Sequence, residues 1–195
     1  LVYTVIFTQI MSARLPGIDN KLGYSIYLCS GIFAWGLFSE IVSRSQVVFL
    51  ENANLIKKIK FPVLCLPAII VTTALINFAI VMTLFLGALL VTGNFPGISL
   101  IALIPIVLVQ IFFSISLGMT VGILNVFFRD VGQLFSLLLT LWFWATPIIY
   151  PISILPDSIA TLVQLNPLTS LVGSYQTLFL TSKNPPLSEL VYPFT

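Results

Sequence analysis

The sequence predicts an all-α integral membrane protein, and three observations support this prediction. Of the 195 residues, 58% are hydrophobic and only 7% are charged, whereas an ordinary soluble domain carries about 25% charged residues. A bilayer core of about 30 Å requires roughly 20 apolar residues per helix, and several runs in this chain are that long. The few charges fall in short clusters between those runs. The predicted fold is therefore one transmembrane domain over residues 1–195.

Two apolar runs precede the most polar part of the chain. The first, residues 1–11, is apolar from its first residue, like the end of a span, and residues 187–195 resemble the start of another span. We therefore expect an internal fragment with both ends missing. The second span is expected over residues 22–50. Glu40 and Arg44 stand four positions apart in it, which lets them pair on one helix face, either as a structural ion pair or as a pair that snorkels towards the interface.

The most polar segment, residues 51–61, separates the second and third spans. It carries three lysines within four positions, while Leu55, Ile56 and Ile59 fall on the other side of a helix. This pattern predicts a short amphipathic helix that lies along the cytoplasmic face. The alternative is a basic loop that fixes the topology and contacts anionic lipid.

The third and fourth spans are expected over residues 63–91 and 98–124, with a tight turn between them. Asn77 lies deep in the third span and requires a partner or water. Small and polar residues recur every four positions along the fourth span: Gln110, Ser114, Gly118 and Gly122. Such a stripe lets helices approach closely, so we expect helix packing, with pore lining as the alternative.

The fifth span is expected over residues 131–150, and aromatic side chains accompany it. The aromatic residues of the second and fifth spans that concern us are Phe33, Trp35, Trp142, Trp144 and Tyr150. A belt of aromatic rings at the membrane interface explains such residues. The alternative is that some of these rings face a conduit and stack on sugar faces.

The stretch 152–180 is apolar, but breaks at 156–158 and 166–167 interrupt it with proline. Two helices of about 9 and 14 residues remain, roughly 14 and 21 Å long, each too short to cross a membrane. We expect a re-entrant or interfacial hairpin on the outer side, followed by a partial sixth span in residues 187–195. Placing the 51–61 segment inside puts five Lys and Arg residues in the cytoplasm and three outside, which agrees with the positive-inside rule.

Several classes of function are excluded by the composition. The chain has no histidine, which removes His-ligated metal sites and Ser-His-Asp triads, and its net charge of +2 gives no reason to expect nucleic-acid binding. Cys29 and Cys65 are expected to be buried hydrophobic side chains and not a disulfide or metal pair. No carboxylate stands clearly at mid-membrane, and the sequence has no G-x-x-x-x-G-K-[ST] loop. If ATP drives this protein, another polypeptide binds it.

Four segments together resemble one family in both order and spacing. They are ENANLIKKIKFP at 51–62, LNVFFRDV at 124–131, LWFWATPIIYPISILP at 141–156 and LNPLTSLVGSYQ at 165–176. They look like the transmembrane permease of bacterial ABC exporters for polysaccharide and polyol phosphate, which includes the O-antigen, capsule and teichoic-acid permeases. The resemblance implies a homodimer of six-span subunits in the bacterial inner membrane. It also implies two copies of a separate ATPase subunit, which bind ATP and Mg, and a lipid-linked glycan as the exported substrate.

The resemblance also assigns roles to residues, none of them catalytic or metal-binding. The residues that couple the permease to the ATPase are Glu51, Asn52, Asn54, Leu55, Ile56, Lys57, Lys58, Phe61, Arg129 and Asp130. The hairpin forms gate helices, with Pro156, Asp157, Asn166 and Pro167 at its breaks. The candidates for the substrate path are the five aromatic residues named above.

Two rival functions stay open on the sequence alone. A permease of the same fold could export a drug or another small lipophilic molecule, in which case a closed hydrophobic seam would replace a long aromatic channel. A membrane enzyme that acts on lipid-linked sugars would need convergent acids or a metal site. The missing histidines and the sparse carboxylates count against the enzyme.

Overall fold

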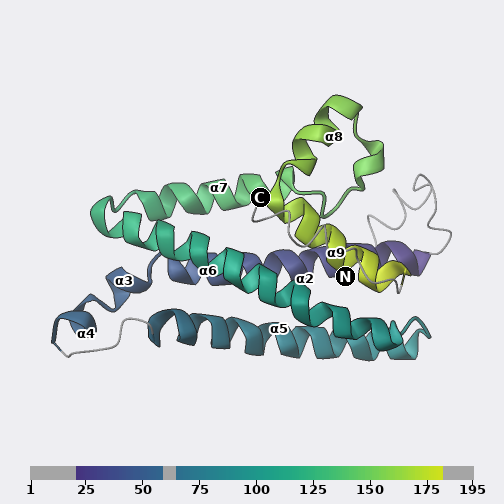
Figure 1. Cartoon of the computed structure of the whole chain (residues 1–195), viewed down its shortest axis with the longest axis horizontal. Helices are drawn as coiled ribbons and strands as arrows, with labels where there is room; N and C mark the ends of the chain where they lie inside the picture. Colours follow the sequence, from purple (N-terminus) through teal and green to yellow (C-terminus); the bar gives the residue numbers. More distant parts are fainter. Residues whose placement is uncertain (1–20, 59–64, 182–195) are drawn as a thin grey trace.

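The computed structural model describes residues 21–58 and 65–181, and this described part is built from helices joined by turns. Three long apolar helices run along its long axis (Figure 1): α2 (Lys21–Ser45), α5 (Cys65–Val91) and α6 (Leu103–Phe127). A short 3-10 helix, η1 (Gly97–Ala102), leads into α6. The predicted partial spans at residues 1–11 and 187–195, and Phe61 in the polar segment, lie outside the described residues.

Three stretches of the described chain are long and apolar enough to cross a membrane: Gly23–Ser45, Cys65–Val91 and Ser99–Phe127. Their exposed surfaces are rich in Ile, Leu, Val and Phe, such as Leu84 at 72% exposure and Phe112 at 63%. Side chains of this kind are stable on a surface only when lipid or protein covers them. The prediction of an all-helical, multi-pass membrane protein is therefore confirmed.

The core of the described part lies around α2, which packs against α5, α6 and α9 (Pro167–Thr181). The largest fully buried side chains include Phe38 and Ile41 of α2, Ile106 of α6, and Leu171 and Tyr175 of α9. In Figure 1, α9 lies against α2 in the half of the bundle that is far from α3. A helix that packs against neighbours on several sides has no single apolar stripe, which explains why periodicity along α2 is weak.

The small-and-polar stripe of α6 is buried against α2, so the prediction of helix packing is confirmed and pore lining is not its role here. A Cβ atom on Gly118 would lie 2.7 Å from Ser45 Cβ, and one on Gly122 would lie 2.5 Å from the Ser45 carbonyl oxygen. The Gln110 amide donates to the Ala34 carbonyl of α2, and its oxygen accepts from the Tyr175 hydroxyl of α9 at 2.6 Å. One buried side chain therefore joins three helices.

The second predicted span, over 22–50, is divided in the structure. Helix α2 ends at Ser45, and two short helices follow, α3 (Val48–Glu51) and α4 (Ala53–Lys58). The carbonyl of Gln46 accepts from the Asn125 amide at 2.8 Å, while the Leu50 amide bonds to Val47. In an unbroken helix the Leu50 amide would bond to Gln46. The Asn125 side chain of α6 therefore occupies the carbonyl that the Leu50 amide would use in an unbroken helix, and the helix breaks at this point.

The fifth predicted span is shorter in the structure, because α7 (Val131–Ala145) ends two residues before Pro147. A proline disfavours the helical conformation of the residue before it and cannot itself donate to the helix. A 3-10 turn, η2 (Ile152–Ile154), and α8 (Asp157–Gln164) lie between α7 and α9. The stretch predicted as a hairpin thus holds helices of 8 and 15 residues, and α8 stands apart from the bundle (Figure 1).

Candidate functional site

The residues predicted to contact an ATPase lie at one end of the bundle, where α3, α4 and the turn between α6 and α7 come together (Figure 1). Glu51, Asn54, Arg129 and Asp130 are exposed there, so their side chains are available to a partner. Asn52 instead donates to the Val48 carbonyl at 2.9 Å. Leu55, Lys57 and Lys58 belong to α4, but their side chains lie outside the described part of the structure.

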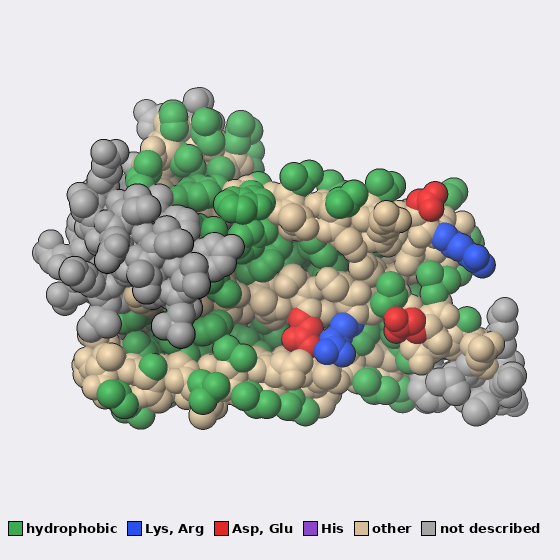
Figure 2. Space-filling model, turned by 180° about the vertical axis from the view of Figure 1, so that it is seen from behind, with side chains coloured by type: hydrophobic (Ala, Val, Ile, Leu, Met, Phe, Trp, Pro, Cys, Tyr) green, Lys and Arg blue, Asp and Glu red, His purple; other side chains and the backbone are tan. Residues whose placement is uncertain are grey.

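An apolar groove of about 300 Å³ lies beside these polar residues, between the short helices and the end of α6. Its lining residues are Phe49, Ala53, Ile56, Ile123, Val126 and Phe127. The Phe127 ring is 74% exposed, while Ile56 is partly buried and packs against the core between α2 and α5. Figure 2 shows acidic and basic side chains near hydrophobic ones at this end of the molecule. This end therefore combines an apolar depression with exposed charges, as a protein-binding surface does.

A buried polar network underlies this surface, and the sequence analysis did not single it out. The Asn125 side chain donates to the Gln46 carbonyl and accepts from the Gly132 amide, at 2.8 and 2.9 Å. Gln46 also donates to the Ser136 hydroxyl at 3.0 Å. The network joins the break after α2 to the start of α7. Its signal in the sequence was one polar residue, Asn125, inside a run of apolar ones.

The aromatic residues predicted to line a substrate path separate into two groups in the structure. Phe33 packs edge-on against Phe85 of α5, with ring centroids 5.0 Å apart. Trp35 and Trp142 both pack against Phe38, on the α7 side of α2, at 5.4 and 5.7 Å.

The two remaining aromatic residues lie beyond these groups, at the end of α7. Trp144 is 63% exposed, and its carbonyl accepts from the Tyr150 hydroxyl at 3.0 Å. In the described part of the structure, the five aromatic rings therefore do not line one common surface. Their role as a glycan path stays a prediction.

Two residues with different predicted roles, Trp142 and Asn166, are in direct contact. The Trp142 indole donates to the Asn166 side-chain oxygen at 3.0 Å, and the Asn166 amide donates to the Thr146 hydroxyl at 3.1 Å. The same oxygen accepts from the Leu168 amide at the first turn of α9, whose first residue is Pro167. Pro156 is exposed just before α8, whereas the side chain of Asp157 lies outside the described set. Asn166 therefore caps α9 and ties it to α7.

Glu40 and Arg44 form the predicted ion pair, with Arg44 Nη2 2.9 Å from Glu40 Oε1. Asn77, which was predicted to need a partner, donates its side-chain amide to the same carboxylate oxygen at 2.7 Å. The contact brings the Glu40 carboxylate opposite the middle of α5. On its own helix, Glu40 lies only five residues before the end of α2 at Ser45.

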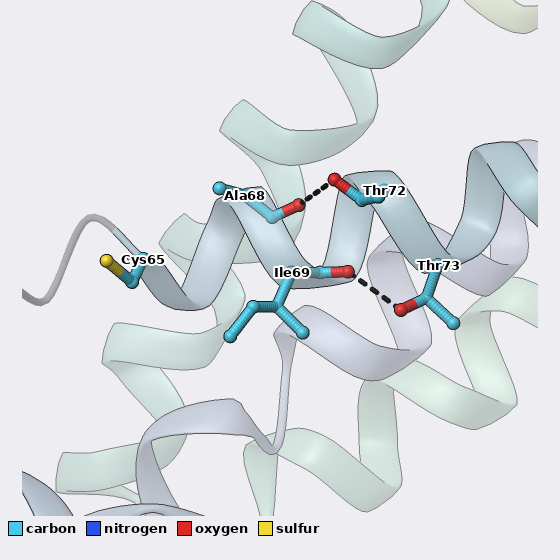
Figure 3. Close-up of a pocket in the computed structure, with 5 residues that line it drawn as sticks. All are labelled: Cys65, Ala68, Ile69, Thr72 and Thr73. Carbon is cyan, nitrogen blue, oxygen red and sulfur yellow. Dashed lines mark hydrogen bonds between the residues drawn. The ribbon is translucent and has the colours of Figure 1, made fainter.

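The hollow in Figure 3 lies along the first turns of α5 and has a volume of about 520 Å³. Its two hydroxyls, on Thr72 and Thr73, donate to Ala68 and Ile69 of the same helix at 2.8 Å each. Cys65 also lines it and, like Cys29, is a free, partly buried cysteine. Both cysteines were expected to be buried, and the structure gives them partial burial. Since this open hollow has its hydroxyls satisfied, it is a helix face and not a built site.

No cluster of three or more His, Cys, Asp or Glu residues that could hold a metal occurs within residues 21–58 and 65–181. Long apolar helices, an exposed polar end and a buried polar network define the class of a multi-pass helical membrane protein. Residues 1–180 match the ABC-2 type transporter family, and the chain belongs to this family.

Curated relatives agree with this assignment. The chain is 33% identical to the O-antigen export system permease protein RfbA of Myxococcus xanthus over 193 residues, which are 98% of this chain and 72% of the relative. It is 30% identical to an O-antigen export system permease protein RfbA of Klebsiella pneumoniae over 181 residues, 92% of this chain and 68% of that protein. The resemblance to the permeases of polysaccharide exporters is thereby confirmed.

Proposed function

We propose that this chain is the membrane-spanning subunit of an ATP-driven exporter that moves a lipid-linked polysaccharide of the O-antigen type across the bacterial inner membrane. The observation that carries the proposal is the similarity, along 92 to 98% of the chain, to relatives that are named O-antigen export permeases. ATP and Mg are bound by a separate ATPase subunit, because the sequence contains no phosphate-cradling glycine-rich loop.

The complete permease has six spans with both ends in the cytoplasm, and it works as a dimer with two ATPase subunits. Three long helices and the shorter α7 account for four of the spans. Helices α8 and α9, of 8 and 15 residues, form the outer hairpin that gates the conduit. At 1.5 Å per residue α8 is about 12 Å long, too short to span a bilayer core of about 30 Å, and α9 follows it after the break at 166–167.

The ATPase docks on the end that carries α3 and α4. Its closure on ATP pushes against the groove lined by Phe49 and Phe127, which lies between these helices and α6. The side chain of Asn125 carries the movement to the start of α7, because it holds both the Gln46 carbonyl and the Gly132 amide. The hydrogen bond between Trp142 of α7 and Asn166 then transmits this movement from α7 to the gate helices α8 and α9.

Deletion of the encoding gene in a bacterium that makes such a polymer tests the function. We expect the polymer to disappear from the surface of intact cells, measured by antibody labelling, and to accumulate inside them. The wild-type gene restores surface polymer when the ATPase is intact, and an ATPase variant without its phosphate-binding lysine does not. Normal surface polymer in the deletion strain, together with lost efflux of a lipophilic dye, would instead favour a drug exporter.

A further inference from the structure

One partly exposed face of α2 is polar, unlike the apolar surfaces of the neighbouring spans. Small and polar residues occupy it over its last three turns: Gly36, Ser39, Glu40, Ser43 and Arg44. The adjacent surface of α5 carries Ile76 and Ile80, at 56 and 58% exposure. Figure 2 shows one red and blue pair near the middle of this face, with green and tan atoms around it and further charged side chains towards one end. Charged side chains within a membrane-spanning helix usually face a water-filled cavity or a protein partner.

The hydrogen bonds of this face are incomplete. Arg44 Nε and Nη2 and the Asn77 amide all converge on Glu40 Oε1, at 3.0, 2.9 and 2.7 Å. Within the described residues, neither Glu40 Oε2 nor the Ser43 hydroxyl has a hydrogen-bond partner, whereas exposed Thr72 and Ser116 bond to their own helices. A carboxylate oxygen left without a partner in hydrocarbon is costly. The face therefore needs water or an occupant that donates hydrogen bonds.

Arg44 does not snorkel towards the end of its span. Its guanidinium turns back by one helical turn onto Glu40, and its side chain is 49% exposed. Asn77, which contacts the same carboxylate, lies 12 residues after Cys65, about 18 Å along α5 at 1.5 Å per residue. Two helices therefore hold the polar group at a point away from the start of α5, and a salt bridge that merely anchors a helix end does not explain the contact with Asn77.

A groove of about 300 Å³ opens beside this group. Its lining includes Phe33, Gly36, Glu40, Asn77, Phe78 and Val81. A Cβ atom on Gly36 would have nothing within 4 Å, so the glycine leaves room on the α2 side of the groove. Aromatic and apolar surface thus lies next to a carboxylate, an amide and a guanidinium.

We propose that this groove is a binding subsite for one sugar unit of the exported glycan, an inference that rests on the proposed function. Sugar hydroxyls can donate to Glu40 Oε2 and accept from Arg44, and the C–H face of the ring packs on the phenylalanines. The ion pair has no net charge, so it does not favour a phosphate group over a neutral polyol. An acyl chain would fill the apolar part but leave the carboxylate oxygen without a donor.

Thiol labelling tests whether water and glycan reach this face. In a Cys29→Ala, Cys65→Ala background, Ser39→Cys reports on the face, and Ile76→Cys is the matched control, since it adjoins Asn77 at the same depth. The assembled complex in membrane vesicles is treated with a charged, membrane-impermeant methanethiosulfonate. We expect Ser39→Cys to react at least about tenfold faster than Ile76→Cys, and more slowly when the cells make the polymer. Equal rates, or cross-linking of Ser39→Cys to a second copy in place of polymer protection, overturn the subsite.

Transport by Glu40→Gln provides the second arm. We expect about a tenfold slower appearance of polymer at the surface, with normal co-purification of the ATPase. If this variant does not assemble, Gly36→Leu replaces it, because Gly36 lines the groove and a Cβ atom there meets nothing within 4 Å, so the larger side chain can occupy the groove without disturbing the packing. Export at the wild-type rate with an assembled variant overturns the subsite and leaves the proposed function intact. A wild-type complex that exports no polymer contradicts the proposed function itself.

Discussion

Single residues decide how closely α2 and α6 approach. Gly118 and Gly122 present only hydrogen atoms to Ser45 of α2, so the two backbones can pack without side chains between them. Membrane helices associate through such close packing and through interhelical hydrogen bonds, because lipid provides no hydrophobic driving force. The Gln110 contact to Ala34 adds a hydrogen bond along the same seam. This interface follows from the four-residue repeat that the sequence already displays.

Replacing Gly122 by alanine should destabilise the protein. The new methyl group would lie 2.5 Å from the Ser45 carbonyl oxygen, so the helices must separate. Overpacking of this kind costs about 1–3 kcal/mol, and we expect a clear fall in the thermal unfolding temperature in detergent. Gly87→Ala is the control, because a Cβ atom there meets nothing within 4 Å. Equal unfolding temperatures for the two variants would contradict the packing argument.

At the scale of elements, polar side chains decide where helices end. Asn125 of α6 bonds to the Gln46 carbonyl at the break after α2, and Asn166 caps α9. Helix α7 ends ahead of Pro147, a boundary that a proline predicts directly. The break after Ser45 has no proline or glycine, so a local pattern could not locate it. Its partner lies 79 positions away in the sequence.

The variant Asn125→Leu should weaken the connection between the break after α2 and the start of α7. Both the Gln46 carbonyl and the Gly132 amide lose a partner, and each buried polar group left unsatisfied costs about 1–3 kcal/mol. We expect a lower unfolding temperature and several-fold slower polymer export at equal protein level. Thr120→Val serves as control, because its hydroxyl bonds only within α6. The idea fails if Asn125→Leu behaves like this control in both assays.

On the scale of the whole molecule, the two ends of the bundle differ in chemistry. The end with α3, α4 and the α6–α7 turn carries exposed Glu51, Arg129 and Asp130 beside an apolar groove. The opposite end holds Tyr24 and Tyr27 of α2, which bond to backbone carbonyls of the segment after α7. An asymmetry of this kind suits a protein that receives force at one end and opens at the other.

Charge reversal at the first end should release the ATPase. We expect the double variant Glu51→Lys, Arg129→Glu to reduce co-purification of the ATPase at least about fivefold, because both side chains are exposed on the end where we propose that the partner docks. The loss should also depend on salt, since exposed charges are screened at high ionic strength. Asn94→Lys, in the exposed turn before η1, is the matched control. Undiminished co-purification of the double variant would remove this surface from the proposed interface.

The sequence by itself determined the all-helical membrane class, the presence of the long helices, the small-residue seam and the pairing of Glu40 with Arg44. These features depend on composition or on residues three to four positions apart, and both can be read along one helix. The tertiary structure alone decided the break at Gln46, the bond between Trp142 and Asn166, and the approach of Asn77 to Glu40. Each of these joins residues at least 24 positions apart. Their partners are set by how helices pack, which no local pattern contains.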